Sequence, residues 1–163
     1  MKKYISLILL CISIASFSQT EIETVNFINT KFNQHKLVAS FGTTYQSIEI
    51  LVIGKAKFIN IKSTLERYPD EDITFTCTFD PKTVNSIIAK TAPNDKSKNI
   101  MISSEIKNIK VWDNTKSKSL NPTDFYSLIL DCDDNELTRI NKALIHLYKI
   151  CGAKMQSDEL FKN

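Results

Sequence analysis

The sequence predicts an α+β fold, in which an N-terminal helix and a long C-terminal helix flank about six or seven antiparallel strands. Two observations lead to this prediction. The segment ITFTCTFD at residues 73–80 alternates apolar residues with threonine, a pattern typical of an antiparallel strand with one wet face. Residues 133–152 instead carry apolar side chains every three or four positions, which indicates an amphipathic helix. We expect a strongly bent sheet, or a barrel, against which this last helix packs.

The N-terminal helix is predicted from its cap and its apolar spacing. Thr20 and Glu23 have the separation of a capping box. Residues 33–36 are expected to end this helix. Its predicted apolar stripe consists of Ile22, Val25, Ile28 and Phe32.

The middle of the chain is predicted to be strands separated by polar connections. Gly54 suggests a turn, and Asp80-Pro81 breaks the threonine-rich strand. Residues 84–90 are compatible with either a short strand or one helical turn. The other expected strands cover residues 45–53, 56–64, 73–79, 100–104, 106–112 and 125–132.

The C-terminal helix is predicted to begin after one of three cap candidates, Asp133, Asp134 or Asn135. Gly152 suits the position just after its last turn. The expected apolar stripe consists of Leu137, Ile140, Leu144, Leu147 and Cys151.

The order of elements over roughly residues 36–152 resembles that of pleckstrin-homology-like secreted bacterial proteins of unknown function. This resemblance implies a bent barrel of strands that a C-terminal helix closes, and the N-terminal helix is extra to it. An ordinary α+β roll and a helix-grip fold have almost the same order, so both stay open as alternatives.

Residues 1–18 have the pattern of a cleaved signal peptide. Lys2 and Lys3 precede an apolar run, and Ser16 and Ser18 are small residues at the expected cleavage site before Gln19. Leu10 before Cys11 is unlike a lipoprotein signal, and an uncleaved anchor is the alternative. The signal resembles in style those of exported proteins of Bacteroidota. We therefore predict a single domain at residues 19–163, periplasmic or secreted, with no transmembrane span after cleavage.

Composition points away from a nucleic-acid partner. The 163 residues include 21 basic and 18 acidic side chains, so loss of Lys2 and Lys3 with the signal leaves 19 basic against 18 acidic ones. Only Arg67 and Arg139 are arginines, the residue that bidentate phosphate and base recognition favours. We expect no nucleic-acid binding.

The sequence contains no recognisable catalytic, cofactor or metal motif. Asp131, Asp133 and Asn135 have calcium-loop spacing, but Glu136 and Lys142 replace the glycine and glutamate that such a loop needs. Cys77, Cys132 and Cys151 are expected to be small buried side chains; should one disulfide form, Cys77 is the expected partner of one of the other two. A hydrolase whose site assembles across the fold would have to use His35 or His146.

Two sets of residues are candidates for binding. Trp112 should point away from the core beside Lys107 and Lys110, which would suit an interaction surface; its alternative role is to cover the sheet beneath a helix. The second set could line an apolar pocket under the last helix: Phe75, Phe79, Phe125, Tyr126 and Leu147.

The function we predict is that of an exported, non-catalytic domain that binds a protein or another macromolecule. The alternatives are a small-molecule or lipid carrier, which would use the apolar pocket, and a hydrolase with an unrecognised site. A toxin-neutralising immunity protein is also compatible with the small size.

Overall fold

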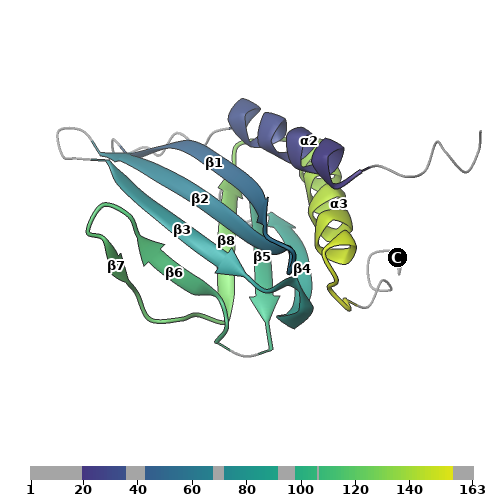
Figure 1. The fold of residues 1–163 in the computed structure, drawn as a ribbon. Helices are drawn as coiled ribbons and strands as arrows, with labels where there is room; N and C mark the ends of the chain where they lie inside the picture. The colour runs from purple at the N-terminus through teal and green to yellow at the C-terminus, as the bar shows by residue number, and fades with distance from the viewer. Residues whose placement is uncertain (1–19, 36–42, 68–71, 92–97, 106, 156–163) are drawn as a thin grey trace, which may run out of the picture.

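The computed structural model shows two helices and two antiparallel sheets, which confirms the predicted α+β class and the position of a helix at each end (Figure 1). It describes residues 20–35, 43–67, 72–91, 98–105 and 107–155, and only the backbone at 43–47 and 65–67. The predicted signal peptide and the cleavage site between Ser18 and Gln19 lie outside the described residues.

Helix α2 (Glu21–Gln34) begins with the predicted capping box. The Glu23 backbone N–H donates to Thr20 Oγ1 at 3.2 Å, and the Thr20 N–H donates to Glu23 Oε2 at 2.9 Å. The predicted stripe is wrong at Ile22, which is 70% exposed, because the helix buries Thr24, Ile28 and Phe32 instead. At 3.6 residues per turn, Ile22 lies about 200° around the helix from Thr24 and so points to solvent.

The first sheet has the strand order β1-β2-β3-β6-β7. Gly54, whose φ is 71°, lies in the turn that connects β1 to β2. The predicted loop at residues 113–123 contains an unpredicted strand, because Lys118–Ser119 fold back on β6. The strands are β1 (Thr43–Ile53), β2 (Phe58–Arg67), β3 (Ile73–Phe79), β6 (Lys110–Asp113) and β7 (Lys118–Ser119).

The second sheet consists of β4 (Val84–Thr91), β5 (Lys98–Ser104) and β8 (Phe125–Leu130), in the order β4-β5-β8. The undecided segment at residues 84–90 is therefore a strand, and the helical turn η1 (Pro81–Thr83) precedes it. In the part of the chain that the structure describes, eight strands form two separate sheets and no closed barrel. The pleckstrin-homology-like resemblance stays a prediction.

Helix α3 (Asp134–Ile150) confirms the predicted C-terminal helix. Asp133 is its cap, and accepts a 2.8 Å hydrogen bond from the Glu136 N–H. All five residues of the predicted apolar stripe are buried, and Gly152 follows the helix with φ of 104°. The helix packs against α2, β4 and β5.

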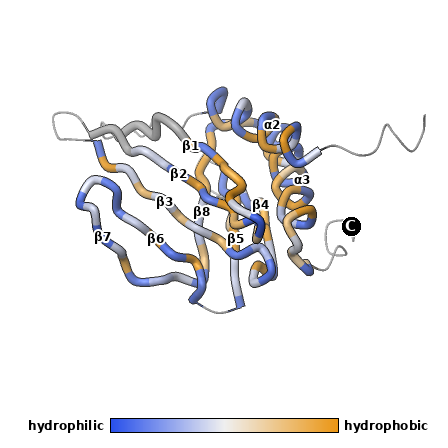
Figure 2. Tube along the Cα trace, viewed as in Figure 1, coloured by the Kyte–Doolittle hydropathy of each residue, from blue (hydrophilic) through white to orange (hydrophobic). Residues whose placement is uncertain are grey.

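The core lies where the inner face of the first sheet meets the second sheet and the helices. Figure 2 shows hydrophobic positions concentrated there, while the β6–β7 hairpin is mostly hydrophilic. Phe79 of β3 is central, because its ring contacts Tyr126 of β8 and Tyr148 of α3 edge-on, at 5.9 and 6.0 Å between ring centroids. These contacts join three elements that are far apart in sequence.

The outermost strand β1 is held to α2 by a side-chain amide. Asn29 Nδ2 donates to the Ile50 carbonyl at 3.0 Å, and the Ile50 N–H donates to Asn29 Oδ1 at 2.7 Å. The asparagine thus takes the place of a neighbouring strand at this position. It satisfies backbone groups at a sheet edge that would otherwise be open to pairing.

Candidate functional site

The candidate site is the side of the five-stranded sheet that faces away from the core, which we call the outer face. Residues alternate across a strand, so Thr74, Thr76 and Thr78 of β3 lie opposite the buried Cys77 and Phe79. Paired strands align these outward positions in rows. One row runs across the sheet through Glu49, Lys62, Thr76, Trp112 and Ser119, and the next through Leu51, Asn60, Thr78 and Lys110.

The outer face exposes large apolar side chains. Ile53 is paired with Phe58 at the end of the β1–β2 hairpin, and they are 45% and 39% exposed. Leu51 and Trp112 on the same face are 44% and 45% exposed. These four belong to a group of only seven large hydrophobic side chains exposed among the described residues. Because exposed apolar groups gather at interaction sites, this concentration marks the face.

A polar hollow of about 410 Å³ lies on the outer face beside the tryptophan row. Asn114 Nδ2 donates to Thr76 Oγ1 at 2.8 Å, and Thr115 Oγ1 accepts a 2.9 Å hydrogen bond from the Thr74 N–H. These bonds fix the hydroxyl and amide groups in place. We call this depression in the outer face the polar hollow. Its lining residues are Lys62, Thr74, Thr76, Asn114 and Thr115.

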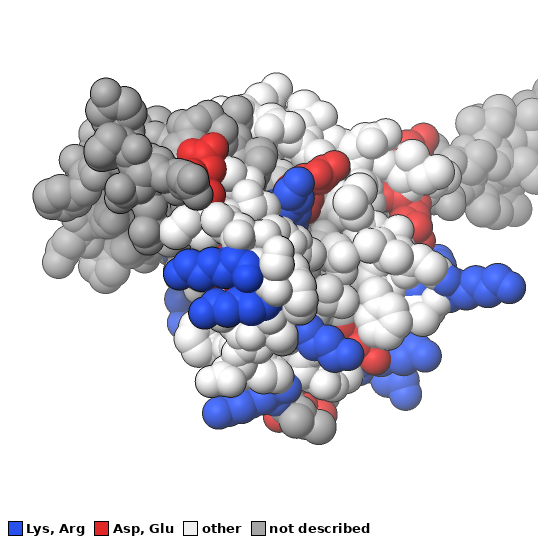
Figure 3. Space-filling model, turned by 60° about the vertical axis from the view of Figure 1, so that its left-hand side comes forward, with Lys and Arg blue, Asp and Glu red and all other residues white. Residues whose placement is uncertain are grey.

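Two lysines of the outer face have no partner among the described residues. Neither Lys62 nor Lys110 makes a hydrogen bond or ion pair with another described residue, although Glu49 is aligned with Lys62 across β1 and β2. Lys116 and Lys118, in the β6–β7 hairpin, are also exposed. Figure 3 shows the side of the molecule on which this hairpin lies, with lysine side chains standing out among largely uncharged residues. The face therefore offers more cations than anions to a partner.

The structure brings together two of the three residues predicted for an interaction surface. Lys110 and Trp112 point to the same side of β6, opposite Ile109, Val111 and Asp113. Neither described helix covers Trp112, which is 45% exposed, so within the described residues it does not have the alternative role of covering the sheet beneath a helix. Lys107 is exposed but precedes β6 and belongs to neither row. Its part in a surface stays a prediction.

Sequence reasoning missed the other residues of the outer face. The register of three strands, β2, β3 and β6, aligns Lys62 with Trp112, and pairing between strands cannot be read from one sequence. A signal did exist for Leu51 and Ile53: with Ile48, Ile50 and Val52 assigned inward, these two apolar residues had to face outward. That both faces of one strand carry apolar residues indicated a contact surface.

The five residues predicted to line an apolar pocket lie in different environments. Phe79 and Leu147 are fully buried, Phe75 and Tyr126 are half-buried, and Phe125 is 54% exposed. Tyr126 contacts Phe79 and shares a 2.9 Å hydrogen bond with Ser63. None of the five lines the polar hollow or a second hollow of about 200 Å³ beside Asn29 and Glu49.

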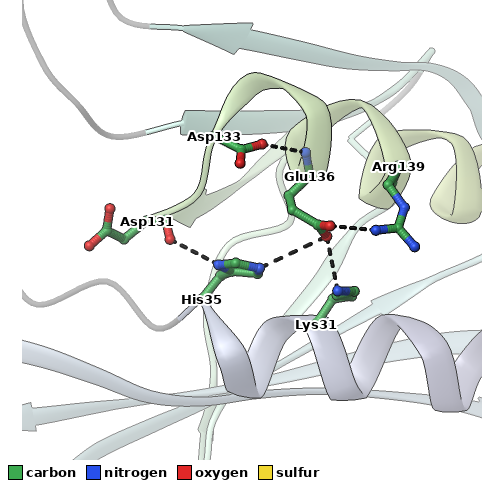
Figure 4. A network of polar contacts seen from close by, with 6 residues as sticks. All are labelled: Lys31, His35, Asp131, Asp133, Glu136 and Arg139. Atoms are coloured by element: carbon green, nitrogen blue, oxygen red, sulfur yellow. Dashed lines mark hydrogen bonds and ion pairs between the residues drawn. The ribbon is translucent and has the colours of Figure 1, made fainter.

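A network of charged groups joins the two helices (Figure 4). Lys31 Nζ lies 3.1 Å from Glu136 Oε2, and Arg139 bonds the other carboxylate oxygen. Lys31 holds the pKa of Glu136 below its ordinary value, although partial burial opposes this. His35 Nδ1 lies 3.1 Å from the carbonyl oxygen of Asp131. The network joins α2 to α3, and it uses the carboxylate of Glu136 for this contact.

The thiols and histidines do not form a catalytic arrangement within the described residues. Neither histidine has a serine hydroxyl or a thiol as hydrogen-bond partner there. The cysteines at 77, 132 and 151 are free. Burial raises the pKa of Cys77 to about 12, and that of Cys132 and Cys151 to about 11. Protonated thiols are poor nucleophiles and poor metal ligands.

The described part of the chain contains no candidate metal site and no candidate membrane-spanning helix. No group of three or more histidine, cysteine, aspartate or glutamate side chains is placed to hold a metal ion there. None of the helices described is long and apolar enough to cross a bilayer.

Comparisons with known proteins give no match for this chain, whether with protein-family models, with curated proteins or with solved structures.

Proposed function

We propose that the protein is an exported, non-catalytic domain that binds a macromolecule through its outer face. The observation on which this rests is the composition of that face. It combines exposed Leu51, Ile53, Phe58 and Trp112 with two lysines that have no partner among the described residues. Aromatic and apolar side chains anchor interfaces, and unpaired charges at their sides guide and orient the partner.

The setting of these side chains supports a rigid binding surface. They stand on paired strands, whose backbone hydrogen bonds fix each position before a partner arrives. Less conformational entropy is lost on binding when side chains are held this way. Trp112 is the strongest anchor candidate, because tryptophan is enriched among the residues that dominate binding energy.

Two further features agree with export and with the lack of catalysis. The N-terminal eighteen residues have the pattern of a signal peptide, which supports a periplasmic or secreted location. The thiols have raised pKa values, and the histidines lack a nucleophile among the described residues. A binding role accounts for the chain without requiring a reaction.

The test compares matched variants in affinity enrichment from the source cell's envelope and medium. The outer-face variant carries Lys62→Glu, Lys110→Glu and Trp112→Ala, while the control carries Lys90→Glu and Phe125→Ala on the second sheet. We expect a component that the wild type and the control retain equally and that the outer-face variant loses. Equal retention by all three proteins, with circular dichroism showing each folded, would overturn the proposal.

A further inference from the structure

We propose that the polar hollow binds an acidic sugar unit, a pyranose ring that carries a carboxylate, with Trp112 as a stacking platform beside it. This inference rests on the proposed function and names the class of its ligand: an acidic carbohydrate chain that lies across the outer face. It follows from the chemistry of the lining, from the unpaired Lys62 and from the position of Trp112.

The lining of the polar hollow suits a ring covered with hydroxyl groups. Its lining residues carry three threonine hydroxyls, one side-chain amide and one ammonium group, and no carboxylate or apolar residue is among the described residues that line it. Hydroxyl and amide groups both donate and accept hydrogen bonds, as sugar hydroxyls do. The hollow is shallow and open to solvent, with a volume of about 410 Å³, so it can be reached by one ring of a chain that lies across the sheet.

Hydrogen bonds within the lining hold its groups ready for a ligand. Thr115 Oγ1 is fixed between the Thr74 N–H and the Asp72 carbonyl, and the hydroxyls of Thr64 and Thr74 are 3.1 Å apart. Asn114 donates to Thr76, while its side-chain carbonyl oxygen bonds no other described residue. That oxygen can accept from a sugar hydroxyl. A site built this way loses little freedom on binding.

Lys62 selects an acidic sugar over a neutral one. Lys62 lines the hollow, and its ammonium group has no ion pair among the described residues, even with Glu49 on the adjacent strand. A carboxylate that receives hydrogen bonds from an ammonium and from hydroxyls is held by charge-assisted bonds, which are about twice as strong as neutral ones. A neutral sugar would gain no such bond from Lys62.

Trp112 extends the site along the sheet. Thr76 lies between Lys62 and Trp112 in the same row, so their backbones are about 10 Å apart at the usual strand spacing. The indole is 45% exposed, and its N–H has no partner among the described residues. The electron-rich face of an indole attracts the weakly positive C–H groups of a pyranose. A chain with one ring in the hollow can place its neighbour on Trp112.

The same lining argues against an acidic peptide as the occupant. A peptide gains most of its affinity from apolar anchors in well-packed pockets. None of the described residues that line the hollow is an apolar residue, and Leu51, Ile53 and Phe58 lie on β1 and β2 in other rows. The observations therefore favour the carbohydrate.

The experiment is calorimetric titration of the protein with tri-galacturonic acid at low ionic strength, with cellotriose as the neutral sugar and poly-glutamate as the acidic peptide. We expect binding of tri-galacturonic acid only. Lys62→Gln and Trp112→Ala should each weaken it about tenfold or more, because each removes one anchoring contact. Lys90→Gln and Phe125→Ala, on the second sheet, should leave it unchanged.

Three results would overturn the inference: no heat with tri-galacturonic acid, equal binding by Lys62→Gln, or binding of poly-glutamate that Lys62→Gln abolishes. Thermal melts verify that each variant is folded. Failure here is distinct from failure of the proposed function. If tri-galacturonic acid does not bind while the outer-face variant still loses its partner in the enrichment, the binding role stands and the sugar assignment falls.

Discussion

The helical side of the molecule and the outer face of its five-stranded sheet differ in whether their charged side chains form ion pairs. Around the helices, Glu136 contacts Lys31 and Arg139, and Glu21 lies 3.0 Å from Lys57. On the outer face, Lys62 and Lys110 have no partner among the described residues. Two glutamates of the helical side are thus paired with cations, while Lys62 and Lys110 of the outer face are paired with no described residue.

The two regions also differ in how they use apolar residues. Helix α3 buries its whole apolar stripe against the sheets and α2. The outer face instead exposes Leu51, Ile53, Phe58 and Trp112 to solvent. The exposed part of these side chains adds no burial to the fold, and exposed apolar patches are typical of interaction sites. The contrast therefore separates residues that hold the fold from residues that we propose serve binding.

The largest effect should come from removing an aromatic ring from the core. Phe79→Ala deletes a fully buried ring that contacts Tyr126 and Tyr148, and should lower the free energy of unfolding by about 3–5 kcal/mol. Trp112→Ala removes a ring on the outer face that is 45% exposed, so it should lower the free energy of unfolding clearly less than Phe79→Ala does. Urea denaturation measures both. Similar losses of unfolding free energy in the two variants would contradict the difference between the core and the outer face.

The next effect concerns the contact between α2 and the sheet edge. Asn29→Ala removes both hydrogen bonds to Ile50 and leaves its backbone groups without a partner, which should cost about 1–3 kcal/mol of unfolding free energy. Asn26→Ala is the matched control, because Asn26 is exposed on the same helix. A loss in Asn26→Ala equal to that in Asn29→Ala would mean that helix propensity, rather than the edge contact, is responsible.

The smallest effect is a change in the pH dependence of stability. The pKa of Glu136 is lowered chiefly by Lys31, so its charged form is stabilised by folding. This contribution is complete above the carboxyl pKa of the unfolded chain, near 4.5, and disappears as pH falls through the lower folded value. Glu136→Gln should therefore flatten the acid limb of the stability profile below about pH 5.

The control for this prediction is Glu105→Gln, which alters an exposed carboxylate with no ion pair among the described residues. Its profile should retain the wild-type acid limb. Thermal melts between pH 3 and pH 7 compare the three proteins. If Glu136→Gln keeps the wild-type slope, the network in Figure 4 does not couple the helices through charge.

Much of the fold could be predicted because local signals agreed with the packing. The alternation of threonine with apolar residues at 73–79 and the stripe of α3 both reflect burial of one side of an element. Ile22 was assigned wrongly because apolar spacing alone does not tell which side of a short helix meets the sheet. The β7 strand was missed because two residues carry no periodicity, and only pairing with β6 defines it.

The candidate site was only partly predictable. Trp112 and Lys110 could be placed on one face by alternation within a single strand. Lys62 joins them through the pairing of β2 with β3 and of β3 with β6, which depends on contacts between distant segments. The polar hollow likewise needs Asn114 and Thr115, which follow β6 and return over β3.

The measurement that tests the central claim most directly is lysine acylation of the protein with and without extract of the source cell's envelope, read by mass spectrometry. The account predicts that Lys62 and Lys110 become protected in the extract, while exposed Lys90 on β4 and Lys149 on α3 react as in buffer. Protection of Lys90 or Lys149 with Lys62 and Lys110 unchanged would contradict it, and would place the binding surface on the other side of the molecule.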